Sequence, residues 1–79
     1  MNEVVYGNKP EPSTPYVTAV SVYGDLENIC RRLRSDHAAI AAVLGTNHSA
    51  SIALWHAFEQ AQIAKERVNI VLPRMPGAI

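Results

Sequence analysis

The sequence predicts an α+β fold in which an antiparallel two-helix hairpin packs on a small β layer. Three observations lead to this prediction. Segments 26–44 and 50–67 carry apolar residues at helical spacing around a short break at 45–49. Segment 16–23 is rich in β-branched and aromatic residues, and segment 68–72 has three β-branched residues in five. The alternative is an all-α hairpin that oligomerises, with 68–72 continuing the second helix.

Residues 1–15 are expected to form an extended arm, because Pro10, Pro12 and Pro15 fix φ and remove three backbone donors. Such an arm is either poorly ordered or lies across a neighbouring subunit or a target. A single small domain then covers 16–73. It opens with the strand 16–23, in which six of eight residues are β-branched or aromatic and which Gly24-Asp25 ends. Prolines and a glycine make 74–79 an irregular tail.

Each predicted helix has a start signal, an apolar stripe and a stop signal. Asp25 is the expected N-cap of 26–44, and Gly45 is the expected αL residue after its end. The stripe of this first helix comprises Leu26, Ile29, Cys30, Leu33, His37, Ile40, Val43 and Leu44. Either Ser49 or Asn47 can cap the second helix.

The second helix carries two stripes of residues at helical spacing. The main stripe comprises Leu54, Ala57, Phe58, Ala61, Ala64 and Val68. The second stripe comprises Ile52, Trp55, Glu59 and Ile63. One stripe is expected to pack on the first helix. The other needs a second partner, which is either the β layer or another copy of the chain.

Composition limits both the stability and the setting of the chain. A domain of 79 residues rarely gains more than about 3–5 kcal/mol from its core, so it usually needs a disulfide, a metal or self-association. Cys30 is the only cysteine, which excludes an internal disulfide and favours a reducing, cytoplasmic location. No segment has the roughly 20 apolar residues of a membrane span. Seven basic and seven acidic residues cancel, which counts against nucleic acid as the main partner. Self-association is therefore expected.

Catalysis and metal binding are not expected. Cys30, His37, His48 and His56 are the only soft ligands, and no two of them stand three or four positions apart. Cys30 lies on an apolar stripe, where a thiol is inert. The sequence has no phosphate-binding glycine loop and no signature of a cofactor.

Two groups of residues are candidates for binding. An interface with a protein partner is expected at Trp55, Ile52, Ile63 and Tyr16, because tryptophan anchors many interfaces and the isoleucines share its stripe. An anionic ligand or partner is expected to contact Arg31, Arg32, Arg34, Lys65 and Arg67.

The expected function is that of a small, non-enzymatic, self-associating protein-binding module. The short length also favours an inhibitor of a host protein, encoded by a phage or mobile element. The alternative is an oligomeric sponge for a nucleotide or another small anion. The hairpin, the pair Arg67-Val68 followed by Pro73, and the short length resemble small phage proteins that sequester cyclic oligonucleotide signals, in architecture alone and over 26–73. A second alternative is a helix-turn-helix-like DNA binder, although 50–62 has no basic residue.

Overall fold

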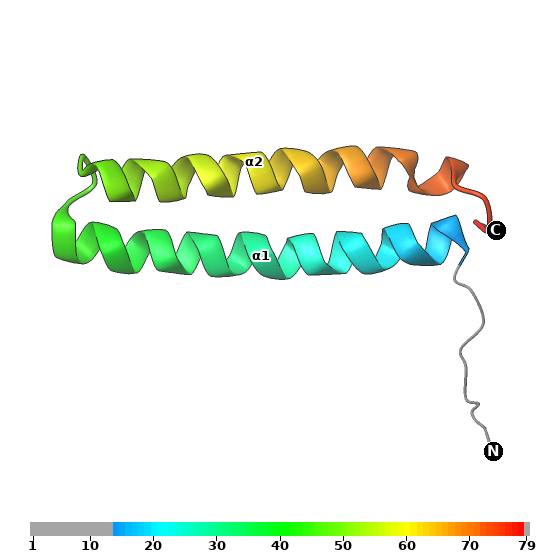
Figure 1. The fold of residues 1–79 in the computed structure, drawn as a ribbon, viewed down its shortest axis with the longest axis horizontal. Coiled ribbons are helices and arrows are strands. Elements are labelled where there is room, and N and C mark those ends of the chain that lie inside the picture. Colours follow the sequence, from blue (N-terminus) through cyan, green and yellow to red (C-terminus); the bar gives the residue numbers. More distant parts are fainter. Residues whose placement is uncertain (1–13, 79) are drawn as a thin grey trace, which may run out of the picture.

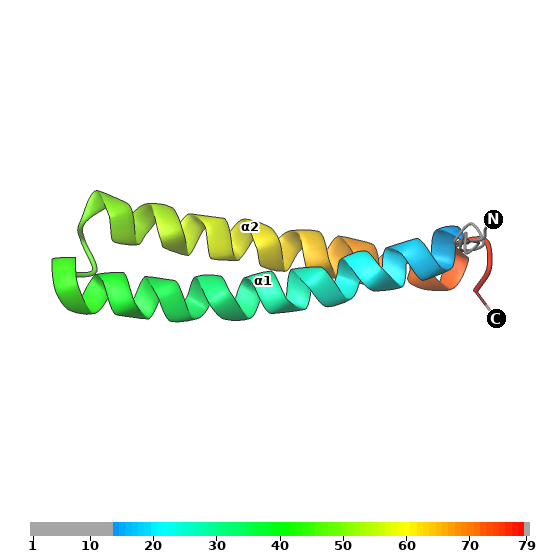
Figure 2. The same cartoon turned by 60° about the horizontal axis from the view of Figure 1, so that its bottom comes forward.

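The computed structural model describes residues 14–78, which form an antiparallel hairpin of two long helices (Figure 1). Helix α1 spans Pro15–Leu44, helix α2 spans Ser49–Val71, and the short 3-10 helix η1 spans Leu72–Arg74. Figure 2 shows α1 and α2 side by side along their length, with axes that cross at a shallow angle. The described residues contain no strand, so the predicted α+β fold is wrong and the all-α alternative fits. No helix among them is both long enough and apolar enough to cross a membrane.

The predicted strand 16–23 is wrong because these residues form the first turns of α1. Thr14 is the N-cap, and its Oγ1 accepts a hydrogen bond from the backbone N–H of Val17 at 3.1 Å. Pro15 follows at the first helical position, where its missing N–H costs nothing. Asp25, the predicted cap, therefore lies inside the helix. The prediction gave too much weight to β propensity, which packing against another element readily overrides. The rest of the predicted arm, 1–13, lies outside the described residues.

Gly24 provides a direct test of this longer helix. It lies in the interior of α1, and a Cβ added there meets no atom within 4 Å. Gly24→Ala is therefore expected to raise the free energy of unfolding by about 0.5–1 kcal/mol, because glycine loses more backbone entropy in a helix than alanine does. Urea unfolding followed by circular dichroism at a fixed protein concentration measures the change. A loss of stability would contradict a helix that continues through this position.

The two helices meet along a seam in which residues recur at alternating steps of three and four. In α1 the seam comprises Ala19, Tyr23, Leu26, Cys30, Leu33, His37 and Ile40, and in α2 it comprises Ser51, Leu54, Phe58, Ala61, Lys65 and Val68. All of these residues are buried or half-buried. This spacing is that of a coiled coil, whose contact stripe is narrow. Ile29, Val43, Leu44 and Ala57, which were predicted to lie on the apolar stripes, are consequently exposed.

The turn joining the helices is held by backbone geometry and one buried hydroxyl. Helix α1 ends at Leu44 as predicted, and Gly45 follows with φ of 96°. Its ψ of 153° lies outside the αL region that was expected. His48 caps α2 in place of Ser49 or Asn47, through its Nδ1, which accepts the N–H of Ala50 at 3.0 Å. Ser51 is fully buried and donates its hydroxyl to the carbonyl of Gly45 at 2.6 Å, so it fastens α2 to the turn.

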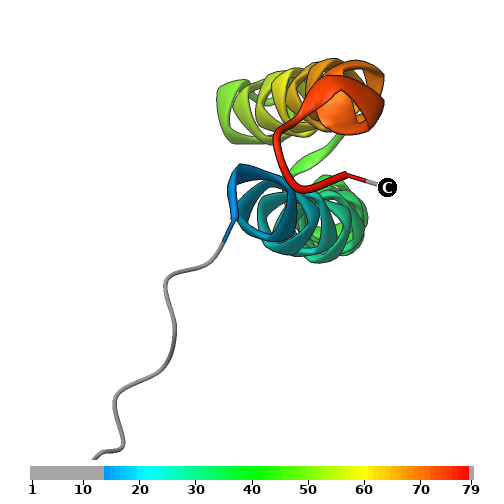
Figure 3. The same cartoon turned by 90° about the vertical axis from the view of Figure 1, so that its right-hand side faces the viewer.

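The end of the hairpin opposite the turn is closed by the C-terminal segment, and we call it the closed end. The predicted strand 68–72 is wrong, because α2 continues to Val71 with Val68 in phase with the seam. Pro73 then lies in η1, after which the chain crosses to the start of α1 (Figure 3). The backbone N–H of Tyr16 donates to the carbonyl of Pro76 at 3.0 Å. We call 72–78 the docked tail.

Candidate functional site

Trp55, the predicted interface anchor, packs partly on its own hairpin. Its ring lies 5.0 Å from that of His37 on α1 and 5.0 Å from that of Phe58, both between ring centroids. The ring planes are tilted by 54° in the first pair and 39° in the second. Both centroid distances fall within the range at which aromatic pairs attract one another. Trp55 nevertheless remains 39% exposed. It is therefore held in place by this chain while it still offers surface to another molecule.

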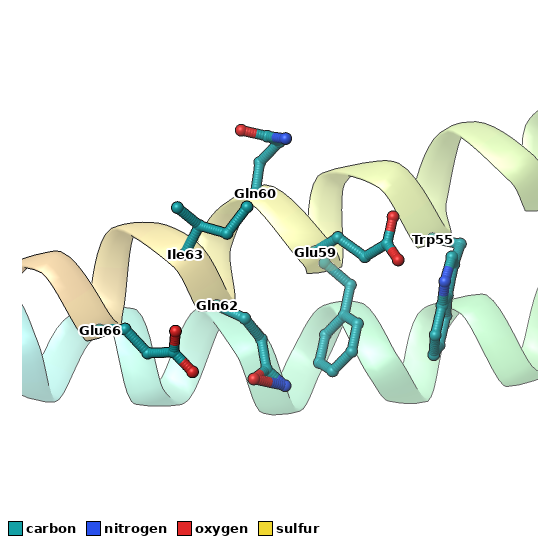
Figure 4. A pocket seen from close by; sticks show the side chains of 7 residues that line it. Trp55, Glu59, Gln60, Gln62, Ile63 and Glu66 are labelled. Carbon is teal, nitrogen blue, oxygen red and sulfur yellow. The ribbon is translucent and has the colours of Figure 1, made fainter.

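An open hollow of about 490 Å³ lies beside Trp55 on α2. It is lined by Trp55, Phe58, Glu59, Gln60, Gln62, Ile63 and Glu66. Figure 4 shows Trp55 and Gln62 pointing toward α1, whereas Ile63 points away from it. Ile63 thus does not cover the hairpin of its own chain, and Ile52, one turn before Trp55, is exposed to the same extent. The structure therefore places three of the four predicted interface residues on one helix, within about three turns.

Tyr16 does not belong to this group. It is half-buried in the first turn of α1, where its backbone holds the docked tail. His37, which touches Trp55, lies farther along the same helix. At a rise of 1.5 Å per residue, Tyr16 and His37 lie about 30 Å apart along the axis of α1. The ring of Tyr16 is thus placed at the closed end of the hairpin, far from Trp55.

A smaller hollow of about 180 Å³ brings together three of the five predicted anion-binding residues. It is lined by Glu27, Cys30, Arg31, Arg34, Phe58, Gln62 and Lys65. Arg31 also donates a hydrogen bond to the side-chain oxygen of Asn28. Arg32 lines a different hollow, on the outer side of α1. Arg67 follows Lys65 by two positions, about 200° around α2, so it lies away from the hollow.

The two hollows adjoin each other because both are lined by Phe58 and Gln62. Together they define one side of the hairpin, which we call the aromatic face. Its members are Glu27, Cys30, Arg31 and Arg34 on α1, and Trp55, Phe58, Glu59, Gln60, Gln62, Ile63, Lys65 and Glu66 on α2. Sequence reasoning missed Glu27, Gln62 and Glu66 as members of a site. Gln62 and Glu66 stand seven positions after Trp55 and Glu59, so extending the second stripe by one heptad would have found them.

Cys30, His37 and His48, three of the four candidate soft ligands, occupy structural positions in the described range. In the range 14–78, no group of three or more histidine, cysteine, aspartate or glutamate side chains is placed to hold a metal ion. Cys30 is a free thiol, 6% exposed, in the seam between the helices. His37 lies against Trp55 and His48 caps α2, so both histidines have structural contacts. What the face offers instead is apolar surface bordered by charges of both signs.

A comparison of the chain with protein-family models, with curated proteins and with solved structures finds no match.

Proposed function

We propose that this chain is a non-enzymatic protein-binding module that self-associates through the aromatic face. The observation that carries the proposal is the small core of the hairpin. Within residues 14–78 only Ala19, Cys30 and Phe58 are buried hydrophobic residues, whereas eleven large hydrophobic side chains are exposed. A monomer with this balance buries little of the apolar surface that stabilises a fold. Two of the eleven, Trp55 and Ile63, belong to the aromatic face, so a partner that covers this face adds to the buried apolar surface.

The aromatic face has the composition of a protein interface. Two aromatic residues, Trp55 and Phe58, stand on this face with the aliphatic Ile63, and charged groups surround them. Interfaces typically combine an apolar centre that contains aromatic residues with a polar rim. An apolar groove also exists at the closed end, between the start of α1 and the docked tail, but only uncharged residues line it. The aromatic face is therefore the better candidate, because its charges can select and orient a partner.

The two alternatives receive less support from the geometry. The hollow that holds Arg31, Arg34 and Lys65 measures only about 180 Å³ and contains the carboxylate of Glu27. The hollow of about 590 Å³ that Arg31 and Arg32 line has no aromatic or apolar side chain, whereas pockets for small ligands are lined mainly by such residues. The arginines are thus better suited to ion pairs with a protein than to enclosing a nucleotide. The helix-turn-helix alternative requires helices crossing at about 90–120°, whereas α1 and α2 run antiparallel (Figure 1). A role as an inhibitor of a host protein stays a prediction from chain length.

Removing the aliphatic groups beside Trp55 tests this proposal. The double variant Ile52→Gln/Ile63→Gln removes Ile63 from the face and the exposed Ile52 at its margin, one turn before Trp55. It is expected to raise the dissociation constant for self-association by about tenfold or more. Each isoleucine is 43% exposed, and full burial of such a side chain is worth about 1.5–3 kcal/mol. Glutamine keeps the helix propensity. Sedimentation equilibrium across a range of concentrations measures the constant for the variant and for the wild type.

A matched control is available on the other side of α1. Ile29 and Val43 are exposed by 45% and 78%, and neither lines the aromatic face. Ile29→Gln/Val43→Gln is therefore expected to leave the dissociation constant close to that of the wild type. A wild-type chain that stays monomeric at high micromolar concentration, or two double variants that weaken association equally, would contradict the proposal.

A further inference from the structure

The charges on the aromatic face are separated by helix. On α1, Arg31 and Arg34 face the smaller hollow, together with the single carboxylate of Glu27. On α2, Glu59 and Glu66 border the larger hollow. Formal charges give the α1 edge +1 and the α2 edge −2, and Lys65 stands in the seam between them. One edge of the face therefore attracts the other edge of an identical face.

The positions of these charges along the hairpin also match. Cys30 and Lys65 line the same hollow on antiparallel helices, so residues after Cys30 lie level with residues before Lys65. Arg34 is thus level with about residue 61 of α2, and Arg31 with about residue 64. Glu59 and Glu66 each lie two residues from one of those levels, which is about 3 Å along the axis.

We infer that the first partner of the aromatic face is a second copy of this chain, related by a twofold axis that runs parallel to the helices. This inference rests on the proposed self-association. The rotation sets α1 of each copy against α2 of the other at the same level. Arg34 of one copy then meets Glu59 of the second copy, and Arg31 meets Glu66. The result is a four-helix bundle in which every pair of neighbouring helices is antiparallel.

The same rotation also fits the apolar centre of the face. Trp55 is level with about residue 40 of α1, by the same counting. Ala38 stands four positions after Arg34, and Ala41 stands seven after it, so both continue the edge that Arg34 marks. Trp55 of one copy therefore lies over two small side chains of the second copy. A twofold axis perpendicular to the helices sets α1 against α1 instead, which brings arginines toward arginines at an energetic cost.

Complementary charge reversal tests this arrangement. Arg31→Glu/Arg34→Glu makes both edges acidic, and Glu59→Arg/Glu66→Arg makes both edges basic. Each variant alone is expected to self-associate about tenfold or more weakly than the wild type, because like charges then face each other. An equimolar mixture of the two is expected to associate as tightly as the wild type, since every opposed pair is again of opposite sign. Sedimentation equilibrium measures all three samples, and circular dichroism confirms that each variant is folded.

The outcomes separate this inference from the proposed function. A mixture that associates no more tightly than its components overturns the twofold arrangement, and so does a variant that keeps the wild-type constant. If Ile52→Gln/Ile63→Gln still weakens association in that case, the aromatic face remains the interface and only the arrangement is wrong. Wild-type association should also weaken in 1 M salt, where the screening length falls to about 3 Å.

Discussion

Replacing Phe58 with alanine is expected to lower the free energy of unfolding by about 3–5 kcal/mol, which is most of what a domain of this size possesses. Phe58 is 7% exposed and is the largest buried side chain in the range 14–78. It lies in the seam, supports the ring of Trp55, and lines both hollows of the aromatic face. Its removal therefore leaves a cavity in the core and an unsupported Trp55. Far-UV circular dichroism in a urea titration should show a largely unfolded chain at low denaturant.

The control for this prediction is Val43→Ala. Val43 is 78% exposed, so the free energy of unfolding of this variant is expected to stay within about 0.5 kcal/mol of the wild-type value. Both measurements need the same protein concentration, because a self-associating chain gains stability by mass action. Retention of a cooperative transition near the wild-type midpoint in Phe58→Ala would mean that the seam is not the main source of stability.

Gly77→Ala is expected to release the docked tail from the start of α1. A Cβ at this position would stand 2.6 Å from Cβ and Oγ1 of Thr14, and Gly77 has a φ of 97° that alanine adopts only with strain of about 1–3 kcal/mol. Thr14 is also the N-cap of α1 and is held by its hydrogen bond to Val17. The clash is therefore expected to displace the docked tail rather than Thr14. Amide hydrogen exchange should report a loss of protection at Tyr16, whose N–H is bonded to Pro76.

The comparison for Gly77→Ala is Gly24→Ala, since the added methyl group there is unobstructed. Gly24→Ala is expected to leave the protection of the Tyr16 amide unchanged or slightly raised. Unchanged protection in Gly77→Ala would show that the closed end of the hairpin does not depend on this contact. Protection lost throughout α1 would show that the tail supports the whole fold.

The hairpin itself could be predicted from local signals. Apolar residues at helical spacing placed both helices, and Gly45 marked the end of the first, where the structure has a positive φ. The second stripe on α2 was also readable, and its members Ile52 and Ile63 are exposed. These features were accessible because each depends on residues close together in the sequence.

What failed depends on partners that are distant in the sequence. The segment 16–23 is β-branched and aromatic by composition, but it lies against the end of α2 and below the docked tail. Packing against these elements favours a helix in this segment, and the β propensity of its residues does not reveal such packing. Glu27 and Lys65 were not grouped, because they line the same hollow only when antiparallel helices align in one particular register. Similarly, nothing near Ser51 in the sequence indicates that its hydroxyl would reach the carbonyl of Gly45.

The contacts that hold the two ends of the hairpin span very unequal distances along the chain, and this has a consequence for the order of folding. Ser51 bonds to Gly45 only six positions away, whereas Tyr16 bonds to Pro76 across nearly the whole described chain. Closing a short loop costs less entropy than closing a long one. We therefore expect the hairpin to form from the turn outward, so that the contact between Tyr16 and Pro76 forms last and opens first.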